Sequence, residues 1–218
     1  MKTLKMLAIG TLLAANFTFA QTTNPVKFGV KAGANLANLS GSGVTSNDPK
    51  FGAYGGIFVN IPINSQFKLQ PEVLYSMQGT KWTTKTPNFL PQMDLTIIND
   101  IKLDYINIPV VVQYEFGKGF YGEMGPQFGF LMSAKSKNEN IIVDRNPAPP
   151  ITTSTSTTTD IKSFLKKADF SGVIGGGYKM TNGLSVDARY AIGFVDIDNS
   201  STVQAKNSVF SLGLGYAF

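Results

Sequence analysis

The chain ends in Asn207-Ser-Val-Phe-Ser-Leu-Gly-Leu-Gly-Tyr-Ala-Phe218, where large apolar side chains occupy every second position. Serine, glycine and alanine fill the positions between them. The apolar set is Phe210, Leu212, Leu214, Tyr216 and Phe218. Because side chains alternate between the two faces of a β-strand, this pattern predicts a ribbon with one apolar face and one small or polar face. In a transmembrane β-barrel, the apolar face of such a strand lies against lipid.

The beginning of the chain has the features of a secretory signal peptide. Lys2 and Lys5 precede an apolar run over residues 6–15, and a small residue follows at Ala20. A positive start, a short apolar centre and a small-residue cleavage site are the three parts of such a peptide. We therefore expect residues 1–20 to be a signal peptide that is removed on export.

Residues 21–218 then suit one exported domain. The chain has no cysteine and therefore no disulfide framework, and its 22 glycines, 16 phenylalanines and 8 tyrosines fit a β-rich fold. After the signal peptide, no apolar run approaches the roughly 18 residues of a transmembrane helix. Such a chain crosses a membrane only as a closed barrel, because the closed ring satisfies every backbone polar group. Without residues 1–20 the net charge falls from +5 to a mild +3, because Lys2 and Lys5 are removed and no acid is. No cluster of lysine or arginine indicates nucleic acid as a partner.

Eight segments alternate apolar with small or polar residues, each near the roughly 9–11 residues that a tilted transmembrane strand needs. They are residues 26–36, 50–63, 67–81, 103–116, 120–133, 169–180, 184–194 and 207–218. The pattern predicts an all-β fold in which residues 21–218 form an eight-stranded, antiparallel, up-and-down transmembrane β-barrel.

The connections between these segments alternate in length. The short ones are residues 64–66, 117–119 and 181–183, and the longer ones are residues 37–49, 82–102, 134–168 and 195–206. Outer-membrane barrels have short periplasmic turns and long extracellular loops. We therefore expect the short connections to face the periplasm and the long ones to lie outside the cell.

The longest connection contains a tract, residues 152–159, that is entirely serine and threonine. Because such a tract buries no apolar area, we expect it to be a mobile loop. Loops carry much of the binding done by proteins, so the long connections are candidates for contact with an extracellular partner.

Three prolines conflict with the simplest form of this prediction. Pro71, Pro109 and Pro126 lie inside predicted strands, where a proline removes a hydrogen-bond donor from the ladder. Bulges, or positions near the rims of the barrel, would accommodate them.

Several short motifs are distributed along most of residues 21–218. They are Lys27-Phe-Gly-Val-Lys-Ala-Gly-Ala-Asn35, Leu69-Gln-Pro-Glu-Val-Leu-Tyr75, Tyr105-Ile-Asn-Ile-Pro109, Gly125-Pro126 and Leu212-Gly-Leu-Gly-Tyr-Ala-Phe218. Together they resemble the motifs of the PorT-like outer-membrane β-barrel family. The resemblance implies an eight-stranded barrel in the outer membrane, with outer-membrane lipid as its surroundings. It also implies insertion by the barrel-assembly machinery, which reads a C-terminal aromatic strand such as the set from Phe210 to Phe218.

The sequence has no histidine and no cysteine. This excludes Ser-His-Asp and Cys-His catalysis and metal sites built from histidine or thiolate. An enzyme would have to use carboxylates alone, as a glycosidase pair does. The inward acids available for that role are Glu72, Glu115, Glu123 and Asp187. We expect no catalytic residue, no cofactor and no metal.

Charged residues of both signs fall on the predicted inner face. An eight-stranded barrel is just wide enough for side chains to fill it, and buried charges must be paired to be tolerated. We therefore expect an ion-pair network that fills the lumen, made by Lys31, Lys68, Glu72, Glu115, Glu123, Asp187 and Arg189. The protein is then not a general diffusion pore, since such pores have about 16–18 strands.

The predicted function is structural or interaction-based, and three alternatives stay open. The first is membership of a secretion or gliding apparatus, the role of the namesake of the PorT-like family. The second is a soluble periplasmic barrel that binds a small apolar ligand, as lipocalins do, with an apolar interior and a polar exterior. The third is a barrel enzyme that uses the inward acids.

Overall fold

The computed structural model describes residues 25–40, 48–146, 149–197 and 205–218. The predicted signal peptide lies outside these residues. No helix within them is long and apolar enough to cross a bilayer.

The described residues form β-strands and one short 3-10 helix, η1. The elements are β1 (Lys27–Ser40), β2 (Asp48–Pro62), β3 (Phe67–Leu90), β4 (Met93–Gly117), β5 (Phe120–Asp144), β6 (Ile151–Asp160), η1 (Lys162–Phe164), β7 (Ala168–Lys179), β8 (Leu184–Gly193) and β9 (Lys206–Ala217).

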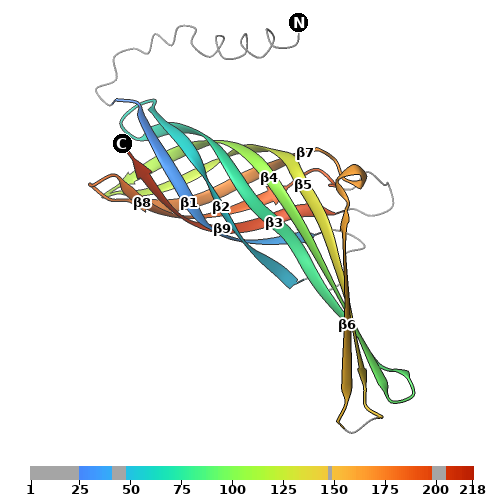
Figure 1. Ribbon diagram of the computed structural model, residues 1–218. Coiled ribbons are helices and arrows are strands. Elements are labelled where there is room, and N and C mark those ends of the chain that lie inside the picture. Colours follow the sequence, from blue (N-terminus) through green and yellow to red (C-terminus); the bar gives the residue numbers. More distant parts are fainter. Residues whose placement is uncertain (1–24, 41–47, 147–148, 198–204) are drawn as a thin grey trace, which may run out of the picture.

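Eight of the strands close into an antiparallel ring (Figure 1). Going round the wall, the order is β1, β2, β3, β4, β5, β7, β8 and β9, and β9 then pairs with β1 from Ser40↔Lys206 to Gly29↔Ala217. The first and last strands therefore seal the barrel, which confirms the predicted up-and-down fold.

The three short connections lie at one end of the barrel, as predicted. Tight turns need residues with positive φ, and Gly117, Lys118, Gly119 and Gly183 supply them with φ between 53° and 97°. Since outer-membrane barrels carry their short turns on the periplasmic side, this end is the periplasmic end.

The prediction of loops over residues 82–102 and 134–168 is wrong for most of their length. β3 continues to Leu90 and β4 begins at Met93, so these two strands form one long hairpin. β5 continues to Asp144, and β6 pairs with it from Lys135↔Asp160 to Asp144↔Ile151. The serine and threonine tract is therefore a strand, because β-branched threonine favours extended backbone and β5 offers it a partner.

These extensions form a four-stranded continuation of the same sheet beyond the barrel wall, which we call the projecting sheet. It consists of residues 81–90 of β3, 93–102 of β4, 135–144 of β5 and all of β6, paired in that order. In Figure 1 it extends away from the barrel at the end opposite the C-terminus. All ten residues of β6 are exposed.

Two local features mark the point where the projecting sheet leaves the barrel wall. Gly79 in β3 has φ of +137°, and a Cβ atom there would lie 2.0 Å from the carbonyl oxygen of Ile101. The β4–β5 register shifts between Asp104 and Tyr105, which leaves Met132 as an extra residue in β5. Beyond this bulge β5 exchanges its neighbour β7 for β6.

The apolar face of the wall points outward, as the alternation predicts. The terminal strand exposes 57% of Leu214 and 55% of Leu212, while Gly213 and Gly215 on its other face are buried. Aromatic rings contact one another near both ends of the barrel. The centroid distances are 4.9 Å for Phe67–Tyr114, 4.8 Å for Phe120–Tyr178 and 5.3 Å for Tyr216–Phe218 at the periplasmic end, and 5.1 Å for Phe128–Phe170 and 5.8 Å for Phe170–Phe194 at the other. This arrangement fits the two aromatic girdles of a membrane barrel.

The three prolines occupy paired strands without any bulge, so bulges, one of the two accommodations considered, are not used. On β5, Pro126 pairs with Gly172 within an unbroken register. On β3, the β2–β3 register is the same on both sides of Pro71. Each proline therefore removes one backbone hydrogen-bond donor, while the residue pairs on both sides of it keep the strand register.

Candidate functional site

The lumen contains a central cluster of five charged side chains, one or two from each of four strands. Arg189 on β8 donates to both carboxylate oxygens of Glu72 on β3, at 2.7 and 2.6 Å. It also donates to both oxygens of Glu123 on β5, with Nη2 3.0 Å from Oε2 and Nε in contact with Oε1. One guanidinium thus joins opposite walls of the barrel.

Lys31 on β1 completes the central cluster. Its Nζ atom lies 3.3 Å from Asp187 and 3.5 Å from Glu72, and Asp187 also lies 3.4 Å from Nε of Arg189. The side chains of the cluster are at most 6% exposed. Buried charges need such partners, because an unpaired charge in this environment would be strongly unfavourable.

Neutral amides also bind carboxylate oxygens that accept from Arg189. Gln70 donates to Glu72 at 2.7 Å, and Gln113 donates to Glu123 at 2.9 Å. Asn60 donates to the side-chain oxygens of both glutamines, at 2.8 and 3.1 Å. The carboxylates are therefore fixed by hydrogen bonds as well as by charge.

Lys68 and Glu115, the other two residues of the predicted network, lie apart from the central cluster, near the periplasmic mouth. Lys68 binds Oε1 of Glu115, and Lys179 on β7 lies 3.4 Å from the same oxygen atom. Lys179 also donates to Gln113 at 2.8 Å, and this links the mouth to the central cluster. Five of the seven predicted residues therefore lie in the central cluster, and the other two lie at the periplasmic mouth.

Inward aromatic residues were not predicted as part of the interior. A Cβ atom on Gly213 would lie 2.0 Å from the hydroxyl of Tyr54, and one on Gly29 would lie 2.2 Å from the ring of Phe58. The glycines of β9 and β1 therefore leave space that rings from β2 fill. Glycines at alternate, inward positions of a strand could have indicated large side chains on a neighbouring strand.

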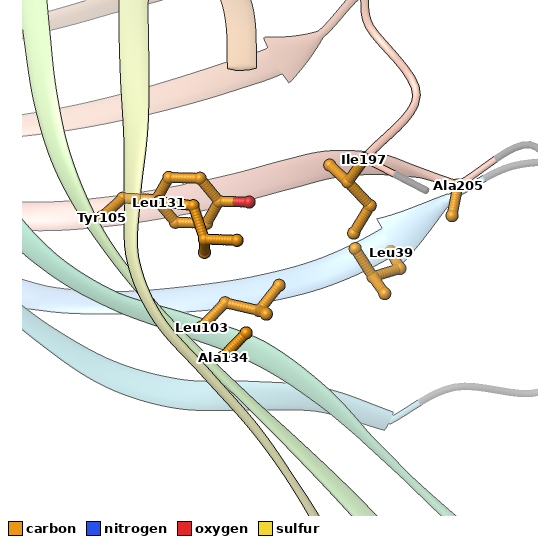
Figure 2. Close-up of a cluster of buried hydrophobic side chains, with 7 residues drawn as sticks. All are labelled: Leu39, Leu103, Tyr105, Leu131, Ala134, Ile197 and Ala205. Carbon is orange, nitrogen blue, oxygen red and sulfur yellow. The ribbon is translucent and has the colours of Figure 1, made fainter. Parts of the chain in front are cut away.

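A cluster of buried apolar side chains fills the lumen near its outer end (Figure 2). Its members are Leu39, Leu103, Tyr105, Leu131, Ala134, Ile197 and Ala205. Ile197 lies in the predicted connection 195–206, and its backbone N–H donates to the carbonyl oxygen of Ala205 at 2.8 Å. A connection thus folds inward, which the alternation of strand residues could not reveal.

Within the described residues, no group of three or more acidic side chains is arranged to hold a metal ion. The inward acids instead contact lysine, arginine or amide partners.

Residues 19–199 match the family described as outer membrane protein beta-barrel domain. The chain belongs to this family. Its location is therefore the outer membrane. The soluble lipocalin-like alternative is wrong, because the lumen carries the buried charges and the outer face of the wall is apolar.

The comparison with solved structures finds matches at low sequence identity, and the likeness to Neisserial surface protein A supports the fold. Neisserial surface protein A is 18% identical, with a TM-score of 0.50, over 89% of this chain and 100% of that chain. The attachment invasion locus protein Ail of Yersinia pestis, solved with the heparin analogue sucrose octasulfate, is 16% identical, with a TM-score of 0.45, over 89% and 100%. No curated protein sequence matches the chain.

Proposed function

We propose that the protein is a closed outer-membrane barrel, with neither pore nor catalytic activity, that binds an extracellular partner through its projecting sheet. The observation that carries the proposal is the sheet itself, in which three wall strands continue beyond the barrel and a fourth is added. An extension of this size is unnecessary for closing the ring.

Side chains across the lumen support the closed state. The central cluster joins β1, β3, β5 and β8, and the apolar cluster lies between it and the outer end. Eight-stranded barrels have interiors that side chains can fill.

Ion conductance tests the closed state. The folded protein in a planar lipid bilayer should give no current steps above those of the bilayer alone. A variant in which Arg189, Glu72 and Glu123 are all replaced by alanine should conduct more than the wild type. Steady conductance by the wild type would contradict a filled lumen.

The two faces of the projecting sheet differ in charge. The strand registers place its lysines and acids on one face, except Asp144 at the tip. The other face carries Trp82, Thr84, Thr86, Leu95, Ile97, Asn99, Ile101, Ser136, Asn138, Asn140, Ile142, Thr153, Thr155, Thr157 and Thr159. A neutral face of hydroxyl, amide and aliphatic groups is suited to contact with another macromolecule, because little charge must be desolvated.

Strand β6 forms an edge of this sheet. It pairs with β5 on one side, and β5 is its only paired strand within the described residues. Residues 152–159 give this edge an uncharged run of serine and threonine, with Asp160 at its end. Such an edge can accept a further strand through backbone hydrogen bonds.

Site-specific photo-crosslinking in intact cells tests the binding role. A photoreactive residue at Thr155 should form a discrete adduct with an extracellular protein, whereas one at the lipid-facing Leu214 should not. An excess of protein with an intact β6 and no photoreactive residue should compete for the same partner and abolish the adduct. Equal labelling from both positions, or none from Thr155, would contradict the proposal.

The motif resemblance supports a narrower assignment to the PorT-like family, with insertion by the barrel-assembly machinery. If that machinery reads the terminal strand, Phe218→Ala should lower the amount of folded protein in the outer membrane. Refolding of the same variant in detergent should be unchanged. Equal amounts of wild type and variant in cells would contradict the role of the terminal aromatic residue.

A further inference from the structure

The periplasmic mouth of the barrel contains a cavity of about 270 Å³. The short turns contribute Ser65, Thr181 and Gly183 to its lining, which places it at the periplasmic end of the lumen. Lys68, Lys179 and Glu115 lie in its wall. The residues of the central cluster and the projecting sheet that carry the proposed function, Lys31 excepted, do not line this cavity.

Positive charge exceeds negative charge in this wall. The ammonium groups of Lys68 and Lys179 contact the same oxygen atom, Oε1 of Glu115. A single carboxylate thus faces two cations. Lys27 lines the same cavity and makes no ion pair with any residue that the structure describes.

The fourth lysine of the lining does not add to this excess. Lys31 is almost completely buried and is paired with Glu72 and Asp187 in the central cluster. The excess of positive charge is therefore confined to the mouth, where Lys27, Lys68 and Lys179 share the single carboxylate of Glu115. Like charges on low-dielectric walls raise the local potential and concentrate ions of the opposite sign.

We propose that the periplasmic mouth is a binding site for a small oxyanion, held by Lys68 and Lys179 with Lys27 at the rim. Two ammonium groups that share one oxygen atom are close enough to bridge two oxygens of a phosphate or carboxylate group. The cavity has room for such a group and several water molecules.

Titration of the detergent-folded full-length protein with inorganic phosphate tests this site. Binding, followed by ³¹P NMR and calorimetry, should weaken about tenfold in Lys68→Gln and in Lys179→Gln, the loss typical of one charge-assisted hydrogen bond. Lys27→Gln should weaken binding less, and this variant removes no ion pair of the fold. Lys102→Gln, on the projecting sheet, is the matched control and should bind as the wild type does.

Glu115→Gln gives the sharpest test, because it removes the carboxylate that competes with the ligand. Phosphate should bind this variant more tightly than the wild type, whereas a purely structural role of Glu115 would weaken binding. A parallel titration with acetate distinguishes phosphate from carboxylate as the preferred ligand, and binding of either supports the site. The proposal is overturned if neither anion binds at millimolar concentration, or if Lys68→Gln and Lys179→Gln bind as tightly as Lys102→Gln.

Discussion

Arg189 contacts three buried carboxylates, those of Glu72, Glu123 and Asp187. Without it, Glu72 and Asp187 would keep Lys31 as their only cationic partner. Glu123 would keep only the amide of Gln113. The stability of the barrel should therefore depend on this one side chain more than on any exposed charge, since removing one partner of a buried pair leaves the other uncompensated.

Replacement of Arg189 by methionine should lower the free energy of unfolding by about 3–5 kcal/mol. Urea unfolding of the barrel in lipid vesicles measures this change. Arg145→Gln is the control, because Arg145 is 43% exposed and its pair with Asp94 should contribute no more than about 1 kcal/mol. Equal effects of the two substitutions would contradict a buried network.

Gly213 and Tyr54 offer a second test of the interior. Gly213→Val should destabilise the barrel by about 1–3 kcal/mol, because its Cβ atom would meet the Tyr54 hydroxyl at 2.0 Å. Tyr54→Leu in the same chain should recover part of that loss, because it removes the clashing ring and hydroxyl. A double-mutant cycle measures the coupling, and strictly additive effects would show that the two residues do not share this space.

Among the elements, β3, β4 and β5 each serve both the barrel and the projecting sheet. The parts of these strands that lie in the barrel wall could be predicted, because residues such as Ile106 to Phe116 alternate in polarity over a full strand. The parts in the projecting sheet could not, because apolar residues occur there on both faces of β4, at Ile97 and Ile98. In β6 every residue of the tract is polar, so extended backbone is indicated by the β-propensity of threonine and not by any alternation.

The backbone conformation at Gly79, where the projecting sheet leaves the barrel wall, should affect the stability of that sheet and not the stability of the barrel. Gly79→Val should be strained, because φ is +137° and the new Cβ atom would lie 2.0 Å from the carbonyl oxygen of Ile101. Hydrogen exchange should then be faster in residues 81–101 and unchanged in β8 and β9.

Gly55→Ala is the matched glycine control for this experiment. A Cβ atom at Gly55 would meet its nearest neighbour at 3.6 Å, an ordinary contact. This variant should therefore exchange as the wild type does. If hydrogen exchange in the Gly79→Val variant were faster throughout the barrel, a local role for Gly79 would be contradicted.

For the molecule as a whole, the sequence was sufficient for the ring of eight strands and for the inward position of the charged residues. Both depend on a period of two, which each strand expresses locally. Two features needed the folded chain. The division of the predicted network into a central cluster and a mouth depends on the tilt and register of the strands, and the apolar cluster depends on Ile197, which a connection brings into the lumen.

The arrangement predicted for the membrane-inserted protein places the apolar outer face of the barrel in lipid and the projecting sheet in water outside it. Spin labels placed one at a time at Leu214, Ile192 and Thr155 in vesicle-inserted protein test it most directly. Labels at Leu214 and Ile192 should be accessible to oxygen dissolved in the acyl chains, and the label at Thr155 should be accessible to a water-soluble nickel complex. Water accessibility at Leu214 and Ile192, or lipid contact at Thr155, would contradict the account.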